Sequence, residues 1–292
     1  MDHSSKPILV TGATGKQGGA AADHLLRNGW QVRILTRHPS DDKARSYADR
    51  GAQIFQGDFE DRSSLQKAIE GCYGAFSVQN PWECGVEAEV RQGCMFADIA
   101  ADADVRHFIY SSVASAPDST GIPHFDSKWK VEQHIAGLDL PCTVLRPVYF
   151  MENFVSLPDL RQGIEQGTFR MAMRPDRPLE LVAVDDIGGI AAMAFDDPDR
   201  WVGEAIDIAG DSLTMPDVAK RLSSQLGHAV LFEAISVDDV RKAAGDDAAV
   251  MYDWFNRTGY SVDIGGVRKM YRPLKNFDTW LMEHSIWAKQ PV

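Results

Sequence analysis

Short apolar segments alternate with amphipathic segments along the first half of the chain. The first apolar segment, PILVTG at 7–12, ends at a glycine, and a helical pattern with alanines and leucines on one face follows it to about residue 28. The same succession repeats and predicts five more strands, at 31–36, 52–57, 74–78, 106–112 and 142–147. Helical patterns separate them, near 41–49, at 61–70, within 84–103 and around HFDSK at 124–128. Such alternation predicts a parallel sheet covered by helices.

After Pro147 the alternation becomes less regular. Residues 153–178 contain three prolines and no clear strand. A strand at 179–184, a helix that begins near Asp185 and a strand at 204–210 follow, and the remaining pattern is mostly helical.

We therefore predict an α/β fold, a Rossmann-type doubly wound parallel sheet with a smaller, mostly helical C-terminal domain. Residues 1–152 are assigned to the first domain, which 185–210 are expected to rejoin. Residues 153–184 and 211–292 are assigned to the second domain, which we expect to form a lid with a substrate or partner site.

Composition and charge disfavour several classes of function. A chain of 292 residues with 44% hydrophobic and 25% charged residues is typical of a globular protein. Its net charge of −12 disfavours direct binding to nucleic acid, because such affinity comes mainly from Lys and Arg. No window approaches the roughly 20 apolar residues that cross a bilayer, and the start MDHSSKP lacks the apolar core of a signal peptide. We expect a cytoplasmic protein that does not bind membranes.

The four cysteines indicate no metal site or disulfide. Cys72, Cys84, Cys94 and Cys142 show no CxxC spacing. If Cys84 and Cys94 share one helix, they lie roughly 15 Å apart along its axis, which is too far for a disulfide. We expect buried free thiols.

The segment TGATGKQGG places three glycines between a predicted strand and a predicted helix. Gly12 permits a tight turn, Gly15 lets the backbone approach a pyrophosphate, and Gly18 lets helix and strand pack closely. The start of the helix then faces the phosphates. We predict a dinucleotide site that also includes Thr14, Lys16 and Gln17.

The end of the second strand favours NADP(H) over NAD(H). An acid that binds the ribose hydroxyls of NAD is expected there, but the strand ends in Thr36, Arg37 and His38. Arg37 suits a 2′-phosphate, with Lys16 and Lys43 as reinforcement. The alternative is a solvated surface arginine.

Three further positions follow the third and fourth strands. Asp58 and Phe59 fit a wall for the adenine, or else a helix cap and a core aromatic. Asn80 lies where the cofactor passes the carboxyl edge of the sheet, and Trp82 either covers the nicotinamide or anchors its loop.

Six segments together resemble one family, the NmrA-like branch of the atypical short-chain dehydrogenase/reductases. They are TGATGKQGG, TRHP, QGDFED, NPWE, HFDSKWKVEQHI and RPVYFMENF. The resemblance extends over about residues 6–210, more faintly beyond, and is greatest to the members that bind NADP(H) as redox sensors. It implies a Rossmann fold, NADP(H) and a regulatory role.

The resemblance also implies roles for three residues of a catalytic constellation. Lys128 corresponds to the lysine that holds the nicotinamide ribose, and Ser112 to the serine that orients the carbonyl. His124 stands where the superfamily enzymes have their proton-donating tyrosine. An imidazole is mostly neutral at pH 7 and is then a poor acid, so we expect the proton donor to be absent.

The segment after the sixth strand corresponds to the lining of the nicotinamide site. Pro147, Tyr149 and Phe150 fall there, and Asn153 extends the segment toward the second domain. Core packing is the alternative for the two aromatic residues.

Two functions remain open at this stage. The first is an NADP(H)-binding, redox-sensing regulator that acts on a protein partner through its second domain. The second is an NADPH-dependent reductase of an activated small-molecule acceptor, such as a quinone or conjugated enone, which needs little help from an acid. Either protein is expected to be a monomer or a homodimer.

Overall fold

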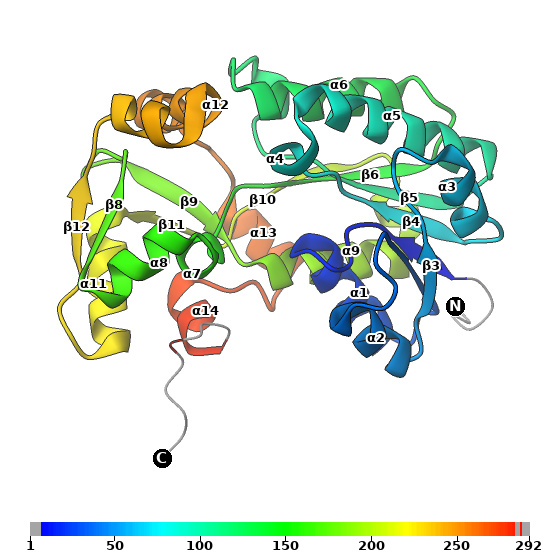
Figure 1. The fold of residues 1–292 in the computed structure, drawn as a ribbon, viewed down its shortest axis with the longest axis horizontal. Coiled ribbons are helices and arrows are strands. Elements are labelled where there is room, and N and C mark those ends of the chain that lie inside the picture. The colour runs from blue at the N-terminus through cyan, green and yellow to red at the C-terminus, as the bar shows by residue number, and fades with distance from the viewer. Residues whose placement is uncertain (1–6, 284–286, 288–292) are drawn as a thin grey trace. The chain divides into compact units, whose positions relative to one another are not determined.

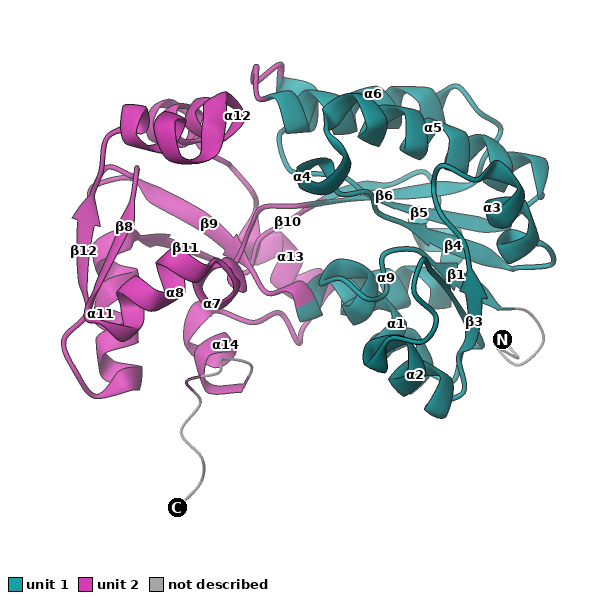
Figure 2. Cartoon of the chain, in the orientation of Figure 1, with its two compact units in different colours: residues 1–118, 123–146, 185–206 teal, residues 119–122, 147–184, 207–292 magenta. Residues whose placement is uncertain are grey.

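The computed structural model describes residues 7–283 and residue 287. The chain divides into two compact units (Figure 2). Unit 1 comprises Met1–Asp118, Pro123–Arg146 and Asp185–Ile206; unit 2 comprises Ser119–Ile122, Pro147–Val184 and Asp207–Val292. That the first domain binds cofactor while the second binds a substrate or partner stays a prediction.

Within the described residues, the central sheet has seven strands in the order β10-β6-β5-β4-β1-β2-β3 (Figure 1). They are β1 (Ile8–Val10), β2 (Val32–Thr36), β3 (Gln53–Gln56), β4 (Gly74–Ser77), β5 (His107–Ser111), β6 (Cys142–Pro147) and β10 (Ala205–Ile208). Strands β1 to β6 pair in parallel. Strand β10 is also parallel to β6, because Gly203 N–H donates to Cys142 O and Val144 N–H donates to Glu204 O. Each strand lies within a predicted segment, and the predicted fold class is confirmed.

Helices cover both faces of this sheet, with α1, α2 and α9 on one face and α3, α5 and α6 on the other (Figure 1). The helical elements are α1 (Gln17–Arg27), α2 (Asp42–Asp49), α3 (Arg62–Ile69), α4 (Pro81–Cys84), α5 (Val86–Asp102), the 3-10 turn at Ala116–Asp118, α6 (Pro123–Ala136), α9 (Val184–Asp196) and α10 (Pro198–Trp201). On the second face Phe96, Phe108 and Val131 join one buried apolar cluster. Burial of such side chains is the main force that holds helices to the sheet.

The order of the strands reverses its direction at β1, which pairs with β2 on one side and β4 on the other. In doubly wound sheets, ligands bind outside the carboxyl ends of the strands at this switch point. The loops that follow β1 and β4 therefore define the expected site.

Unit 2 combines helices with two small sheets, of order β11-β9-β7 and β12-β8. Its elements are β7 (Tyr149–Phe150), α7 (Asn153–Ser156), α8 (Pro158–Glu165), β8 (Thr168–Met171), β9 (Pro178–Val182), β11 (Asp211–Thr214), α11 (Met215–Leu226), β12 (Leu231–Ala234), α12 (Val237–Arg257), α13 (Ile264–Met270) and α14 (Phe277–Glu283). Phe154, Phe169 and Phe277 are fully buried and pack edge to face. Of these strands only β9 was predicted.

The predicted long helix within 84–103 is confirmed as α5, but the premise that Cys84 shares this helix with Cys94 is wrong. Gly85, at φ 86°, separates α4 from α5, so Cys84 and Cys94 lie on different helices. The distance argument against their disulfide therefore does not apply, but all four cysteines are free. Among the described helices, none is long and apolar enough to cross a membrane.

Candidate functional site

The glycine loop lies at the switch point between β1 and β4. Thr11 Oγ1 donates to Phe76 O at 3.1 Å and accepts from Val78 N–H at 3.0 Å, which fixes the loop to the end of β4. Gly12 has φ 62°, and a Cβ there would lie 2.8 Å from Val78 Cγ1. A larger residue at position 12 would thus be strained in its backbone and would collide with β4.

Close packing at the start of α1 requires a second glycine. A Cβ on Gly18 would lie 2.3 Å from Thr11 O and 2.4 Å from the carbonyl carbon of Gly12. Lys16 is the N-cap residue of α1, no side chain caps this helix end, and no acidic residue stands in its first turn. Thr14, Gly15 and Lys16 are exposed in front of it. This arrangement fits an anion held by the loop and the positive end of the helix dipole.

Helix α2 supports the loop from one side. Lys43 Nζ donates to Thr14 O at 2.7 Å and to Gly15 O at 3.2 Å, and Tyr47 donates to Gly19 O at 3.1 Å. Burial lowers the pKa of Lys43 and raises that of Tyr47 to about 12. In this structure Lys43 therefore binds loop carbonyls, where the sequence predicted reinforcement of Arg37.

Arg37 lies just beyond the end of β2, and no acid follows it on that strand. Its Nη2 donates to Glu83 Oε1 of α4, and both side chains are about half exposed, at 54% and 55%. The hydrogen bond that Arg37 donates to Glu83 raises the pKa of Arg37, and the charges of Glu83 and Asp58 add to that effect. His38 is exposed beside it. Arg37 is thus partly exposed to solvent and forms an ion pair with Glu83.

The residues predicted to form the adenine wall have local structural roles as well. The Asp58 carboxylate accepts the Glu60 N–H at 2.7 Å and thus closes a turn. The Phe59 ring packs edge to face on Phe96 at 5.8 Å, at the margin of the buried cluster beneath α5. Both side chains are half-buried, and the core alternative fits Phe59. The cap alternative for Asp58 is wrong, because the N-cap residue of α3 is Asp61, which accepts from the Ser63 and Ser64 N–H groups.

Helix α4 follows β4 directly. Asn80 is its N-cap residue and accepts the Trp82 N–H at 3.2 Å. Trp82 is 61% exposed, and its ring centroid lies 4.9 Å from that of His124.

Lys128 is buried, unlike a solvated lysine on a helix surface. Its Nζ donates to Glu89 Oε1 of α5 at 2.5 Å, and Ser127 Oγ donates to the second carboxylate oxygen. Glu89 is 0% exposed and Lys128 is 8% exposed. The lysine expected to hold a ribose is therefore paired with a buried acid.

Ser112 and His124 are also buried, and both contact other residues of unit 1. The Ser112 hydroxyl, 2% exposed, donates to Glu132 of α6, and Arg146 Nη2 donates to the same carboxylate at 2.5 Å. His124 is 7% exposed and lies between the rings of Trp82 and Phe125. The three residues of the expected catalytic constellation thus contact other protein groups.

Gln17 joins the glycine loop to the end of β5. Its Oε1 accepts from Ser111 Oγ at 2.5 Å. The structure therefore brings together, at one edge of the unit 1 sheet, the predicted residues of the loop and of the ends of β2, β3, β4 and β5. Pro147, Tyr149, Phe150 and Asn153 belong to unit 2, where Tyr149 is buried against Phe154 and Phe255.

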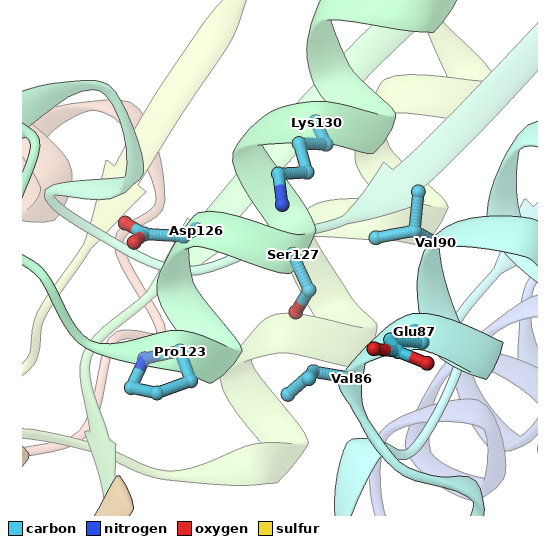
Figure 3. Close-up of a pocket in the computed structure, with 7 residues that line it drawn as sticks. All are labelled: Val86, Glu87, Val90, Pro123, Asp126, Ser127 and Lys130. Carbon is cyan, nitrogen blue, oxygen red and sulfur yellow. The ribbon is translucent and has the colours of Figure 1, made fainter.

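A pocket of about 250 Å³ lies between the beginnings of α5 and α6 (Figure 3). It is lined by Val86, Glu87, Val90, Pro123, Asp126, Ser127 and Lys130. None of these residues belongs to the glycine loop or to a strand end, so this pocket is not the predicted cofactor site. In the described part of the chain, no group of three or more His, Cys, Asp or Glu is arranged to hold a metal.

Three acids of the site were missed in the sequence. Glu83, Glu89 and Glu132 neutralise Arg37, Lys128 and Arg146 respectively. Each lies 14 to 46 positions from its partner, so no local spacing indicates the pairing. Glu83 lies in the NPWE segment and Glu132 in the helix that contains HFDSK, but neither segment indicates the basic partner.

The sequence model of the NmrA-like family matches residues 4–281, which spans both units. An NmrA-like family domain-containing protein of Dictyostelium discoideum is 26% identical over 291 residues, with 94% of this chain and 96% of that protein covered. A (4-alkanoyl-5-oxo-2,5-dihydrofuran-3-yl)methyl phosphate reductase of Streptomyces griseus is 29% identical over 290 residues, with 95% and 98% covered. The solved structure of NmrA, a negative transcriptional regulator in complex with NADP, is similar with a TM-score of 0.80 at 22% identity, covering 96% of this chain and 95% of that one.

Proposed function

The chain belongs to the NmrA-like family, and from this premise we propose that it binds NADP(H) and acts as a redox-sensing regulator with weak or no dehydrogenase activity. The similar regulator NmrA is solved with NADP. The start of α1 would hold the pyrophosphate, and Arg37 would hold the 2′-phosphate. The proposed cofactor-binding residues are Gly12, Thr14, Gly15, Lys16, Gln17, Gly18, Arg37, His38, Lys43, Asp58, Phe59, Asn80, Lys128, Pro147, Tyr149, Phe150 and Asn153.

The state of the expected catalytic residues carries the regulatory part of the proposal. By the resemblance His124 stands in place of the tyrosine, and its ring lies against Trp82. Ser112 donates a hydrogen bond to Glu132, and Lys128 pairs with Glu89. A general acid must donate its proton to the reacting atom of a substrate, and the buried, engaged state of this set disfavours that role. A protein that binds the cofactor without rapid turnover is suited to report the ratio of NADPH to NADP. We place it in the cytoplasm, as a monomer or homodimer, with unit 2 as the surface for a protein partner.

Charge reversal at Arg37 tests the choice of cofactor. Arg37→Glu is expected to weaken NADP(H) binding about tenfold or more and to spare NAD(H), because charge-assisted hydrogen bonds contribute about 1.5–3 kcal/mol. Calorimetric titration of both cofactors measures this. Arg45→Glu, which reverses an exposed charge on α2, is the matched control and should change neither affinity. Equal losses for both cofactors would reject the 2′-phosphate contact.

A reductase of an activated acceptor is the second candidate function. A Streptomyces griseus relative of the chain is named as a reductase, and the exposed Trp82 beside His124 would permit a flat acceptor to approach. A quinone or conjugated enone delocalises the negative charge that arrives with a hydride, so it needs little acid help. The buried His124 is therefore compatible with a reductase of such acceptors as well as with a sensor.

Rates on a panel of acceptors separate the two functions. We expect no useful NADPH-dependent reduction of simple aldehydes or ketones, because general-acid help, which typically supplies roughly 10²- to 10⁴-fold in rate, is missing. Oxidation of NADPH is followed with aldehydes, enones and quinones in parallel. Any quinone turnover should persist in His124→Ala. Brisk aldehyde reduction that disappears in His124→Ala would make the enzyme the leading function.

A further inference from the structure

The four-residue helix α4 contacts both ends of the proposed cofactor site. Its Glu83 accepts a hydrogen bond from Arg37 at the end of β2, and its Trp82 ring lies 4.9 Å from the His124 ring at the start of α6. Successive residues on a helix point about 100° apart, which is how one turn reaches two different elements. Helix α4 therefore connects the group expected to bind the 2′-phosphate with the position expected near the nicotinamide.

These contacts hold α4 weakly. The Arg37 and Glu83 side chains are about half exposed, and such pairs contribute roughly 0.2–1 kcal/mol. Trp82 is 61% exposed. Gly85 ends the helix at φ 86° and ψ 157°, a backbone conformation that almost only glycine adopts. A Cβ at this position would meet no atom within 4 Å. The two exposed side-chain contacts of α4 therefore oppose its displacement only weakly.

Arg37 cannot bind Glu83 and a 2′-phosphate equally well at once. The Glu83 carboxylate occupies its Nη2, and a phosphate on the same guanidinium would lie beside the negative charges of Glu83 and Asp58. A phosphate carries more charge than a carboxylate and accepts bidentate hydrogen bonds from arginine. Exchange of Glu83 for the phosphate thus removes a repulsion and forms a stronger contact.

We propose that Glu83 is an intramolecular competitor for Arg37, and that the 2′-phosphate of NADP(H) displaces it and releases α4 with Trp82 from His124. This inference rests on the proposed function and adds to it a means by which the protein responds to the cofactor. NAD(H) has no 2′-phosphate and leaves the Arg37–Glu83 pair in place. The conformational response is therefore specific for the phosphorylated cofactor even where both cofactors bind.

Neutralising the competitor tests the first half of the inference. Glu83→Gln is expected to tighten NADP⁺ binding by up to about fivefold, which corresponds to about 1 kcal/mol for an exposed pair, and to leave NAD⁺ binding unchanged. Glu87→Gln removes the same charge from an exposed position four residues later and should change neither affinity. Dissociation constants of the full-length protein are measured by calorimetry.

The release of α4 has its own signal. The fluorescence difference between the wild type and Trp82→Phe isolates this indole from the others, and it should change at saturating NADP⁺ and stay constant at saturating NAD⁺. In the Glu83→Gln variant, part of this change in Trp82 fluorescence should be present before any cofactor is added.

The outcomes separate this inference from the proposed function. If the wild type binds NADP⁺ and Glu83→Gln binds it no more tightly, the competition is wrong and the cofactor assignment stands. Weaker binding in Glu83→Gln would show that Glu83 holds Arg37 in place for the phosphate, which also overturns the inference. If neither protein binds NADP⁺, the proposed function fails and this inference fails with it.

Discussion

Lys128→Ala is expected to lower the free energy of unfolding by about 3–5 kcal/mol, the cost typical of removing one partner from a buried ion pair. The reason is Glu89, which is 0% exposed and would keep a charged carboxylate without its cation. Total stabilities are about 5–15 kcal/mol, so this loss would be large. Urea unfolding followed by circular dichroism measures it.

Two variants distinguish the ion pair from other causes. Lys130→Ala removes an exposed lysine two positions later on α6 and should change stability little. The double variant Lys128→Met with Glu89→Leu removes both charges and should regain most of the loss, because well-packed apolar replacements of buried pairs are often neutral or better. A loss below about 1 kcal/mol in Lys128→Ala would mean that the pair is solvated.

This result bears on the predicted role of Lys128 in cofactor binding. From the sequence alone, Lys128 is expected to hold the nicotinamide ribose, and its replacement by Ala to weaken cofactor binding without unfolding the chain. The structure places it against α5 instead. Weaker NADP(H) binding in Lys128→Ala is therefore informative only if the affinity is measured where the variant is folded, and the double variant supplies that background.

The fold was predictable because its signals are local. Each central strand is an apolar run between turn residues, and the glycine spacing after the first marks the switch point at β1. The break at Gly85 was missed because one glycine in a helical pattern is often tolerated, and only its positive φ shows that the helix ends. Helix α4, and with it the Glu83 contact, follows from that break.

Candidate site residues could be proposed from the sequence, but their partners in the fold could not. Arg37 was chosen from its position after a strand, and Ser112 and Lys128 from the family resemblance. Each binds an acid far away in sequence. Such pairs depend on how α4, α5 and α6 pack over the sheet, and the hydrophobic periodicity of the sequence does not specify that packing. The pairs determine which of the residues remain available to a ligand.

A second large effect is expected at His107, a histidine outside the site. It is 0% exposed; its Nε2 lies 2.8 Å from Thr143 Oγ1, which itself donates to Trp201 O at 2.6 Å. Because the threonine proton is used, Nε2 carries the ring proton, and Nδ1 has no hydrogen-bond partner among the described residues. A second proton at Nδ1 would be buried and unsatisfied. Burial accordingly lowers the pKa of His107 from 6.5 to about 4.

The sign of the effect follows from that shift. The unfolded chain takes up a proton at His107 below about pH 6.5 and the folded protein only near pH 4, so the stabilisation is complete above pH 6.5 and is lost as the pH falls to 4. The loss should be about 3 kcal/mol, at 1.36 kcal/mol per pKa unit. The free energies of unfolding of the wild type and His107→Gln are measured by urea titration between pH 7.5 and 4. The difference between the two proteins should be smaller at pH 4 than at pH 7.5 by about 3 kcal/mol. His228→Gln, at an exposed histidine, should follow the wild type throughout. Parallel curves for His107→Gln and the wild type would mean that His107 binds its proton as readily in the folded state as in the unfolded chain.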